Sequence, residues 1–321
     1  MTTFSLCMIV RNEEAVLSRC LDSLKDLMDE IIIVDTGSTD GTKEIAAKYT
    51  DFIYDYTWID DFAAARNFAF EKAHCDYIYS ADADEVLDAV NQKRLAMLKK
   101  AMLPEIEIVQ MHYLTQEKDR TTQNFADEYR PKLFKRLRTF TWIHPVHETV
   151  RLNPVVFDSD IEILHLPQSK HSKRDFTIFT KVYEKDGTLP PELFHMYARE
   201  LFICGTPEDF SDARVIAQNI FESNAEKEDW DILQEALCIL SHCYYLQNDS
   251  ATFFNFAFKA LHDFPCSEIC YDIGMHFEEI GDIKEACYWY ETALNEATAA
   301  IDARTGDDWP RARLSKLKKN L

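Results

Sequence analysis

The stretch Ile31-Ile32-Ile33-Val34-Asp35-Thr36-Gly37-Ser38-Thr39-Asp40-Gly41-Thr42 combines a short apolar run with a polar cluster directly behind it. The four apolar residues predict a strand that is buried on both faces, and the Asp, Ser, Thr and Gly residues predict a turn. A strand that ends in a polar cluster is typical of an open parallel sheet, whose carboxyl edge binds ligands. We therefore expect residues 31–42 to contribute to a binding site at the edge of an α/β sheet.

The same alternation continues on both sides of this stretch. Residues 4–10 form another predicted buried strand, and an amphipathic helix pattern follows over residues 13–28. Short β-rich and helical stretches then alternate up to about residue 180. This pattern predicts an α/β domain, which we assign to residues 1–186.

The second half of the chain has a different pattern. After the breaker cluster Asp186-Gly187-Thr188-Leu189-Pro190-Pro191, β-branched runs disappear, and helices recur with a spacing near the ~34 residues of a tetratricopeptide repeat. The best unit begins near Ser267 and has small and aromatic residues at the packing positions of that repeat, namely Gly274, Phe277, Gly281, Ala286, Tyr290 and Ala293. We predict an all-α repeat domain at residues 187–321, with a plain helical bundle as the alternative.

Charge and composition exclude several classes of function. The 56 acidic residues outnumber the 35 basic ones, and the net charge of −21 disfavours nucleic acid or an anionic bilayer as a partner. No apolar run approaches the ~20 residues that span a membrane, and the N-terminus lacks the basic region of a secretory signal. The nine cysteines include no Cys-x-x-Cys pair and are expected to be reduced, buried thiols. We expect a soluble, cytoplasmic protein.

Four polar segments follow the predicted strands in the order expected of one site. They are Arg11-Asn12-Glu13-Glu14, residues 34–42, Asp61-Phe62-Ala63-Ala64-Ala65-Arg66-Asn67 and Asp82-Ala83-Asp84. Asp82 and Asp84 can converge on a hard divalent cation, which neutralises a diphosphate leaving group. Asp35 can accept hydrogen bonds from a base or ribose, and Arg66 offers a planar cationic fork to phosphates. Taken singly, each of these features also has a structural explanation. Asp82 and Asp84 could lie in a solvated loop, and Asp35 could form a turn. Glu13 or Glu14 could be a helix N-terminal residue, and Arg66 could form a surface ion pair.

The order and spacing of these segments resemble the nucleotide-sugar-binding half of a family-2 glycosyltransferase with the GT-A fold, over about the first third of the chain. The resemblance implies a UDP-sugar donor and inversion by direct displacement with a general base on the acceptor. It also implies residue roles: the backbone of Val10, Glu13 and Asp35 contact the nucleoside, Arg66 the base or phosphates, Asp82 the ribose or metal, and Asp84 ligates Mn²⁺ or Mg²⁺.

The segment Trp142-Ile143-His144-Pro145-Val146-His147-Glu148 resembles the His-Glu motif of family-2 enzymes that carry tetratricopeptide repeats. On this resemblance Glu148 is the expected general base, which must reach the proton of the acceptor. The alternative is a structural carboxylate paired with Arg136 or Arg151. His147 either positions the acceptor or lies in the core.

Residues 163–174 supply the remaining candidates. In many GT-A enzymes a histidine at the position of His165 completes the metal shell, and the alternative is a strand-end histidine bonded to the backbone. Lys170 and Arg174 belong to a basic cluster that could close over the diphosphate. Relatives usually show a His-Tyr-Gly-like step where this chain has His165-Leu166-Pro167, so the local geometry here is expected to differ.

The leading hypothesis is a metal-dependent, inverting hexosyltransferase that uses UDP-GlcNAc or UDP-Glc. Stacked helix pairs build concave grooves, so the repeats are expected to hold a protein or peptide acceptor such as flagellin, or else to form a homodimer. A saccharide or lipid-linked acceptor in cell-surface polysaccharide assembly is the alternative substrate. An inactive sugar-binding scaffold is the third possibility.

Overall fold

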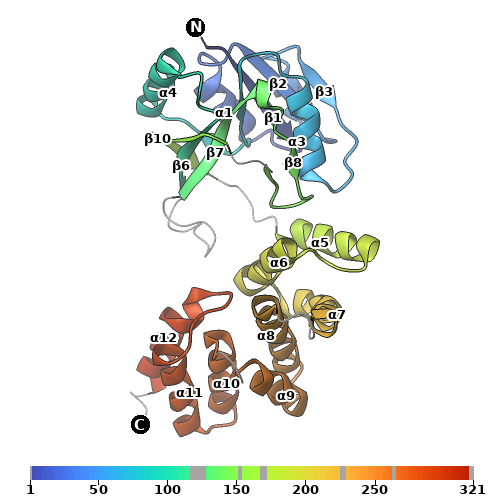
Figure 1. Ribbon diagram of the computed structural model, residues 1–321, viewed down its shortest axis with the longest axis vertical. Coiled ribbons are helices and arrows are strands. Elements are labelled where there is room, and N and C mark those ends of the chain that lie inside the picture. The colour runs from blue at the N-terminus through green and yellow to red at the C-terminus, as the bar shows by residue number, and fades with distance from the viewer. Residues whose placement is uncertain are drawn as a thin grey trace. The chain divides into compact units, whose positions relative to one another are not determined.

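The computed structural model describes residues 2–115, 128–150, 154–166, 172–224, 229–261 and 265–317. These residues form two compact units, Met1–Lys170 and His171–Leu321. Strands occur in the first unit, and the second unit is built from helices (Figure 1). The predicted change from α/β to all-α structure is therefore confirmed.

The first unit is built on one sheet with the strand order β3-β2-β1-β4-β7-β6-β10-β5. Its strands are β1 (Phe4–Val10), β2 (Glu30–Asp35), β3 (Ile53–Asp55), β4 (Tyr77–Ser80), β5 (Glu85–Val86), β6 (Ile108–Thr115), β7 (Glu128–Lys135) and β10 (Val156–His165). Neighbouring strands are parallel except where β7 meets β4 and β6, and where β5 meets β10. All strands except β5 and β7 consequently have their carboxyl ends at the same edge of the sheet. A separate hairpin pairs β8 (Trp142–Ile143) with β9 (Thr149–Val150).

Helices cover both faces of this sheet. They are α1 (Leu17–Leu24), α2 (Thr42–Ala46), α3 (Phe62–Glu71) and α4 (Ala89–Ala101). Leu6, Met8 and Ile33 pack with α1, α2 and α4 on one face, while Cys7 and Ile32 pack with α3 on the other. Because successive side chains of a strand point to opposite faces, a run that is apolar at every position must be buried on both. The predicted burial of residues 31–34 is thus confirmed.

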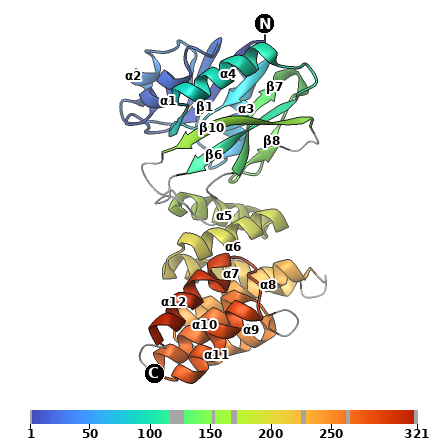
Figure 2. The same cartoon turned by 90° about the vertical axis from the view of Figure 1, so that its left-hand side faces the viewer.

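The second unit contains helices that pack on their neighbours along the chain. They are α5 (Ser172–Asp186), α6 (Pro191–Cys204), α7 (Pro207–Asn224), α8 (Trp230–Leu246), α9 (Ser250–Ala260), α10 (Ser267–Glu279), α11 (Ile283–Asn295) and α12 (Asp308–Leu317). Figure 2 shows α8 to α11 as a stack of adjacent helices. The units divide between Lys170 and His171, ahead of the predicted boundary at residue 186. The reason is that α5 packs on α6 through the rings of Phe176, Phe179 and Tyr197, so the breaker cluster separates two helices of the same unit.

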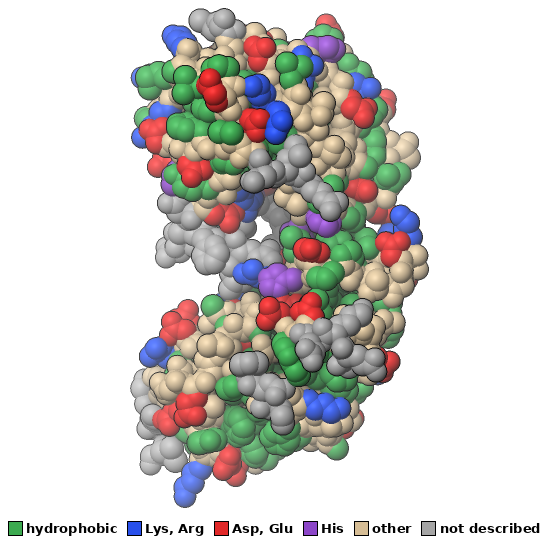
Figure 3. Space-filling model, in the orientation of Figure 1, with side chains coloured by type: hydrophobic (Ala, Val, Ile, Leu, Met, Phe, Trp, Pro, Cys, Tyr) green, Lys and Arg blue, Asp and Glu red, His purple; other side chains and the backbone are tan. Residues whose placement is uncertain are grey.

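Charged side chains of both signs are scattered over the face of the molecule shown in Figure 3. Lys and Arg side chains stand singly or in small groups among Asp and Glu on this face. Nucleic acid and anionic membranes bind to extended cationic surfaces. The described side chains on this face form no such surface, which is consistent with the strongly acidic composition.

Gly274 lets α10 approach α11 closely, and its replacement by Ala is expected to destabilise the second unit. A Cβ atom at this position would lie 2.6 Å from Cε1 of Tyr290, whose ring is fully buried. Overpacking of this kind costs about 1–3 kcal/mol, which outweighs the helix-propensity gain of about 1 kcal/mol. Urea unfolding of Gly274→Ala should show a lower midpoint, whereas Lys284→Ala on the exposed side of α11 should change it little. A more stable Gly274→Ala protein would contradict this packing.

Candidate active site

The first two motifs are joined to each other at the carboxyl edge of the sheet. The side chain of Asn12 accepts a hydrogen bond from the amide of Thr39 at 2.8 Å, and the amide of Glu13 donates to Oγ1 of Thr42 at 2.7 Å. The carbonyl of Val10 accepts from both the amide and the hydroxyl of Thr36. The Val10 carbonyl oxygen is thus occupied, and a contact with a nucleoside would have to use another atom.

Asp35 is almost completely buried at the end of β2 and has one unused oxygen. Its Oδ1 accepts from the amides of Gly37 and Ser38 at 3.0 and 2.9 Å, and Gly37 adopts a φ of +104° that a residue with a side chain rarely adopts. Its Oδ2 has no hydrogen-bond partner among the described residues. A buried acceptor without a partner is costly, so this oxygen suits an N–H or O–H group of a ligand.

Arg66 brings together three motifs that are far apart in the sequence. It lies on α3, with its side chain only 13% exposed, and its Nε donates to Oε1 of Glu148 at 2.5 Å. Its two terminal nitrogens donate to Oδ1 of Asp82 at 2.9 Å and to Oγ of Ser80 at 3.1 Å. The guanidinium also lies over the ring of Trp142, with Cζ 5.3 Å from the ring centre. Arg66 therefore connects the predicted donor side of the site with the predicted general base.

Among the described residues, Glu148 pairs with Arg66 and not with Arg136, one of the two structural alternatives considered from the sequence. Arg136 donates its Nε to the carbonyl of Cys75, and Arg151 lies outside the described residues. The segment that carries Glu148 is attached to α3, because the side chain of Asn67 exchanges hydrogen bonds with the backbone of Trp142 at 2.8 and 3.0 Å.

The backbone next to Glu148 is unusual. His144 and His147 have φ values of +70° and +51°, which lie in the left-handed region. Backbone strain of this kind is concentrated at functional sites. The positive φ values therefore mark the segment that carries Glu148 as a candidate functional segment.

The positive charge of Arg66 helps to hold Asp82 in its ionised form. Burial alone would raise the pKa of Asp82, but the positive charges of Arg66 and Lys132 lower it far below its usual value. Burial alone would lower the pKa of Arg66, but Asp82 and Glu148 raise it. Asp82 and Arg66 therefore form a pair of opposite charges at neutral pH.

Asp84 and His165 lie together, as the resemblance implied. Nε2 of His165 is 3.1 Å from Oδ2 of Asp84, and the amide of Leu166 donates to the carbonyl of Asp84 at 3.0 Å. Two neighbouring ligands of an octahedral cation, each about 2.1–2.2 Å from it, are about 3 Å apart. The pair therefore fits a divalent cation as well as it fits a hydrogen bond. Both side chains are partly exposed, at 23% for Asp84 and 16% for His165, which leaves room for further ligands.

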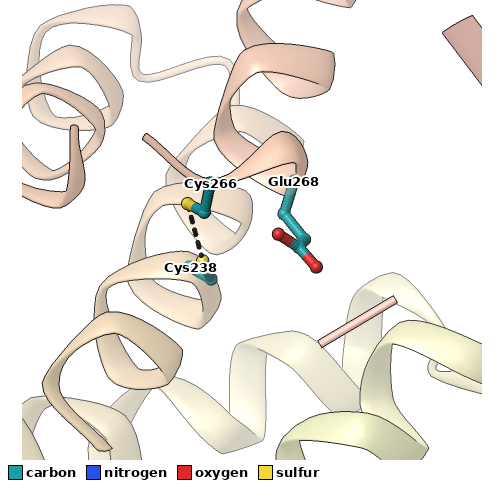
Figure 4. Close-up of side chains that lie close together, drawn as sticks. All are labelled: Cys238, Cys266 and Glu268. Atoms are coloured by element: carbon teal, nitrogen blue, oxygen red, sulfur yellow. Dashed lines mark hydrogen bonds between the residues drawn. The ribbon is translucent and has the colours of Figure 1, made fainter. Parts of the chain in front are cut away.

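Among the described residues, one group of three side chains has its metal-ligating atoms close together, and it lies in the helical unit. It consists of Cys238, Cys266 and Glu268, with the two sulfurs 3.5 Å apart (Figure 4). Glu268, however, accepts hydrogen bonds from three backbone amides of residues 300–302 at 2.7–3.1 Å, so its carboxylate anchors that loop. The hydrogen bond to Cys266 and burial raise the pKa of Cys238, which keeps it a thiol. These residues do not suit a metal.

The other predicted phosphate-binding residues are Lys170 and Arg174. Lys170 lies outside the described residues, and Arg174 is exposed on α5, where its Nε is 3.0 Å from Oδ1 of Asp175. Sequence reasoning missed the buried pair of Glu85 and Lys132 beside the Asp82–Asp84 turn. The sequence did contain one signal for this pair: Lys132 lies between Pro131 and the apolar residues Leu133 and Phe134.

Residues 5–161 match the sequence model of glycosyl transferase family 2. The first unit is a family-2 glycosyltransferase domain. The sheet order and the motifs at its carboxyl edge agree with the GT-A type that the sequence predicted. The family match supports the prediction that the chain is a transferase.

Curated relatives of this glycosyltransferase domain match over parts of their length. A TPR repeat-containing protein of Synechococcus elongatus is 38% identical over 154 residues, which are 47% of this chain and 36% of the relative. Glycosyltransferase SunS of Bacillus subtilis is 35% identical over 102 residues, 31% of this chain and 24% of SunS. Lipopolysaccharide core biosynthesis glycosyltransferase LpsC of Rhizobium meliloti is 36% identical over 107 residues, 32% of this chain and 37% of LpsC. The chain thus spans well under half the length of these three proteins.

Among solved structures, glucosyl-3-phosphoglycerate synthase from Mycobacterium tuberculosis, crystallised with Mn²⁺, UDP and phosphoglyceric acid, is 17% identical. The superposition covers 59% of this chain and 80% of the synthase, with a TM-score of 0.44. Within the residues that the structure describes, no helix has the length and apolar character needed to cross a bilayer.

Proposed function

We propose that this chain is a metal-dependent, inverting glycosyltransferase that moves a sugar from a nucleotide-diphospho-sugar to an acceptor. The observation that carries the proposal is the pair of Asp84 and His165, 3.1 Å apart at the carboxyl edge of a family-2 domain. In the same domain, Asp35 has an unused buried oxygen at the carboxyl end of β2, and Arg66 holds Asp82 and Glu148. These groups match the parts of a diphospho-sugar donor: a base or ribose, phosphates and a sugar.

The proposed donor is a UDP-sugar, with UDP-GlcNAc or UDP-Glc as the first candidates. The unused oxygen of Asp35 requires a hydrogen-bond donor, which the N3–H of uracil or a ribose hydroxyl supplies. Asp84 and His165 would hold the cation, and an imidazole ligand favours Mn²⁺ over Mg²⁺. When bound, the cation would neutralise the charge of the leaving diphosphate. Asp82, held by Arg66, would face the ribose or the cation.

Glu148 is the proposed general base. A base in an inverting transfer takes the acceptor proton as the acceptor attacks the anomeric carbon. Arg66 binds Oε1 of Glu148 and so fixes the orientation of the carboxylate relative to Asp82. Arg66 therefore has two proposed tasks: it orients the base and contributes positive charge beside the diphosphate.

The proposed acceptor is a protein or peptide that binds to the helical unit. This unit contains a cavity of about 420 Å³ between α6, α7, α8, α10 and α12. Its lining combines aromatic and charged side chains: Phe202, Phe210, His242, Tyr271, Asp272, Trp309 and Arg313. A saccharide acceptor is the second candidate, which is favoured by the match to the lipopolysaccharide core enzyme LpsC. A surface for a second copy of the chain is the other proposed use of the helices.

Asp35→Asn is expected to weaken donor binding without unfolding the domain. The variant keeps Oδ1 for the amides of Gly37 and Ser38 but replaces the unused oxygen by an NH₂ donor. Loss of a charged hydrogen bond of about 1.5–3 kcal/mol corresponds to a rise in the KM for the donor of about 10- to 100-fold. Asp55→Asn, at the exposed end of β3, is the matched control and should leave KM unchanged. An unchanged KM in Asp35→Asn would remove Asp35 from the donor site.

The proposed function is tested first by donor hydrolysis. The purified chain is incubated with a panel of UDP-, GDP- and TDP-sugars in Mn²⁺, Mg²⁺ or EDTA, without an acceptor. Metal-dependent release of one nucleotide from one sugar supports the proposal and identifies the donor. If neither release nor metal-dependent nucleotide binding by calorimetry occurs, the inactive scaffold is the better description.

The labelled sugar of the identified donor then distinguishes the acceptors. Transfer to protein or peptide substrates would support the first candidate. Transfer to a saccharide alone would favour the second.

A further inference from the structure

A buried ion pair lies beside the turn that carries Asp82 and Asp84. Nζ of Lys132 on β7 is bonded to Oε1 of Glu85 on β5. The two residues are only 5% and 2% exposed. In this sheet β4 pairs with β7 whereas β5 pairs with β10, so residues 81–84 cross from one part of the sheet to another. The ion pair fixes the far end of this crossing segment to β7.

Glu85 is connected to Asp82, Asp84 and His165. Its Oε2 accepts from the amide of Asp82 at 3.3 Å, and it directly follows Asp84 in the chain. Its ladder partner in the antiparallel pair of β5 and β10 is His165. A displacement of Glu85 would therefore change the separation of Asp84 and His165, which sets the spacing available to a cation.

Stability alone does not account for a buried pair of this kind. Removing two charges from water costs several kcal/mol per ion. A protein in which well-packed apolar residues of similar size replace such a pair is often as stable as the original or more stable. Nζ of Lys132 also lies 5.5 Å from the ring centre of Tyr113, and that ring lies 5.0 Å from the ring of His165. An apolar pair could not reproduce the two hydrogen bonds by which Glu85 links Lys132 to the amide of Asp82.

We propose that Lys132 is a positioning residue: acting through Glu85, it fixes the Asp82–Asp84 turn so that Asp84 stays opposite His165 at the distance a divalent cation needs. This inference rests on the proposed function, because it assigns the cation to Asp84 and His165. Partners one step removed from metal ligands typically change metal affinity by about 10- to 100-fold when they are lost.

The test is Mn²⁺ binding by the full chain in the presence of UDP, measured by electron paramagnetic resonance of free Mn²⁺. The main variant is the double substitution Lys132→Met/Glu85→Leu, which removes one charge of each sign and so leaves the net charge of the site unchanged. We expect its urea unfolding midpoint to stay close to that of the wild type, while its affinity for Mn²⁺ falls at least tenfold. A merely structural role would not produce this separation of stability from affinity.

Two further variants complete the design. Lys99→Met removes a lysine from the ion pair with Asp29, which lies just before β2 at the amino edge of the sheet, and should not change Mn²⁺ affinity. Glu85→Gln keeps the shape of the side chain but deprives Lys132 of its ionic partner, and should weaken Mn²⁺ binding even if the double variant does not fold.

The outcomes separate this inference from the proposed function. Wild-type Mn²⁺ affinity in a folded double variant or in Glu85→Gln would overturn the role of Lys132 and leave the glycosyltransferase proposal intact. A wild-type chain that binds UDP but no Mn²⁺ would overturn both the metal assignment and this inference.

Discussion

Asp84→Ala should lose about a thousandfold or more in the rate of donor hydrolysis and remain folded. A cation that neutralises a leaving diphosphate is worth several kcal/mol of transition-state stabilisation, and each 1.4 kcal/mol is about tenfold in rate. The side chain of Asp84 is 23% exposed, and the hydrogen bond from the amide of Leu166 goes to its backbone carbonyl, which the substitution keeps. The rate is measured with the donor identified in the hydrolysis panel, at saturating Mn²⁺.

The control for Asp84→Ala is Asp160→Ala. Like Asp84, Asp160 is an acidic residue of the first unit, and it forms an ion pair with Arg94. Its side chain, however, is 80% exposed and lies away from the carboxyl edge of the sheet. Its substitution should leave the rate unchanged. Full activity in Asp84→Ala would show that the metal assignment to Asp84 is wrong.

Arg66→Met should have the largest effect on stability, and it should also abolish activity. The substitution leaves Glu148 and Asp82 without their cationic partner, and breaking a buried pair in this way costs about 3–5 kcal/mol. We expect a value near 3 kcal/mol, because the side chain of Asp82 is 40% exposed and water can replace part of the lost contact. Urea unfolding followed by tryptophan fluorescence reports the loss, since Trp142 lies against Arg66.

Two comparisons identify the cause of that loss. Arg66→Lys keeps a positive charge but not the three directed hydrogen bonds, so it should regain part of the stability and little of the activity. Arg138→Met removes an exposed arginine from its ion pair with Glu107 and should cost at most about 1 kcal/mol. If Arg66→Met were as stable as Arg138→Met, the cluster around Arg66 would not be the tightly coupled unit described above.

The elements that bear the site could be predicted because their signals are local. The apolar run at residues 31–34 and the turn chemistry behind it specify a buried strand and its end, whatever surrounds them. The match to family 2 confirms that the motifs at successive strand ends belong to one kind of domain. The domain boundary could not be placed in this way, because the breaker cluster lies between α5 and α6, and the packing of Phe176 and Phe179 on Tyr197 joins these two helices in one unit.

The sequence alone determined which residues stand at the ends of strands, and hence which carboxylates and cations could meet a nucleotide-sugar. Only the tertiary structure decided how they pair. Glu148 pairs with Arg66, 82 positions away, and Lys132 with Glu85, 47 positions away. The physical reason is that a buried charge must find an opposite charge nearby in space, and the strand order β3-β2-β1-β4-β7-β6-β10-β5 sets that proximity independently of spacing along the chain.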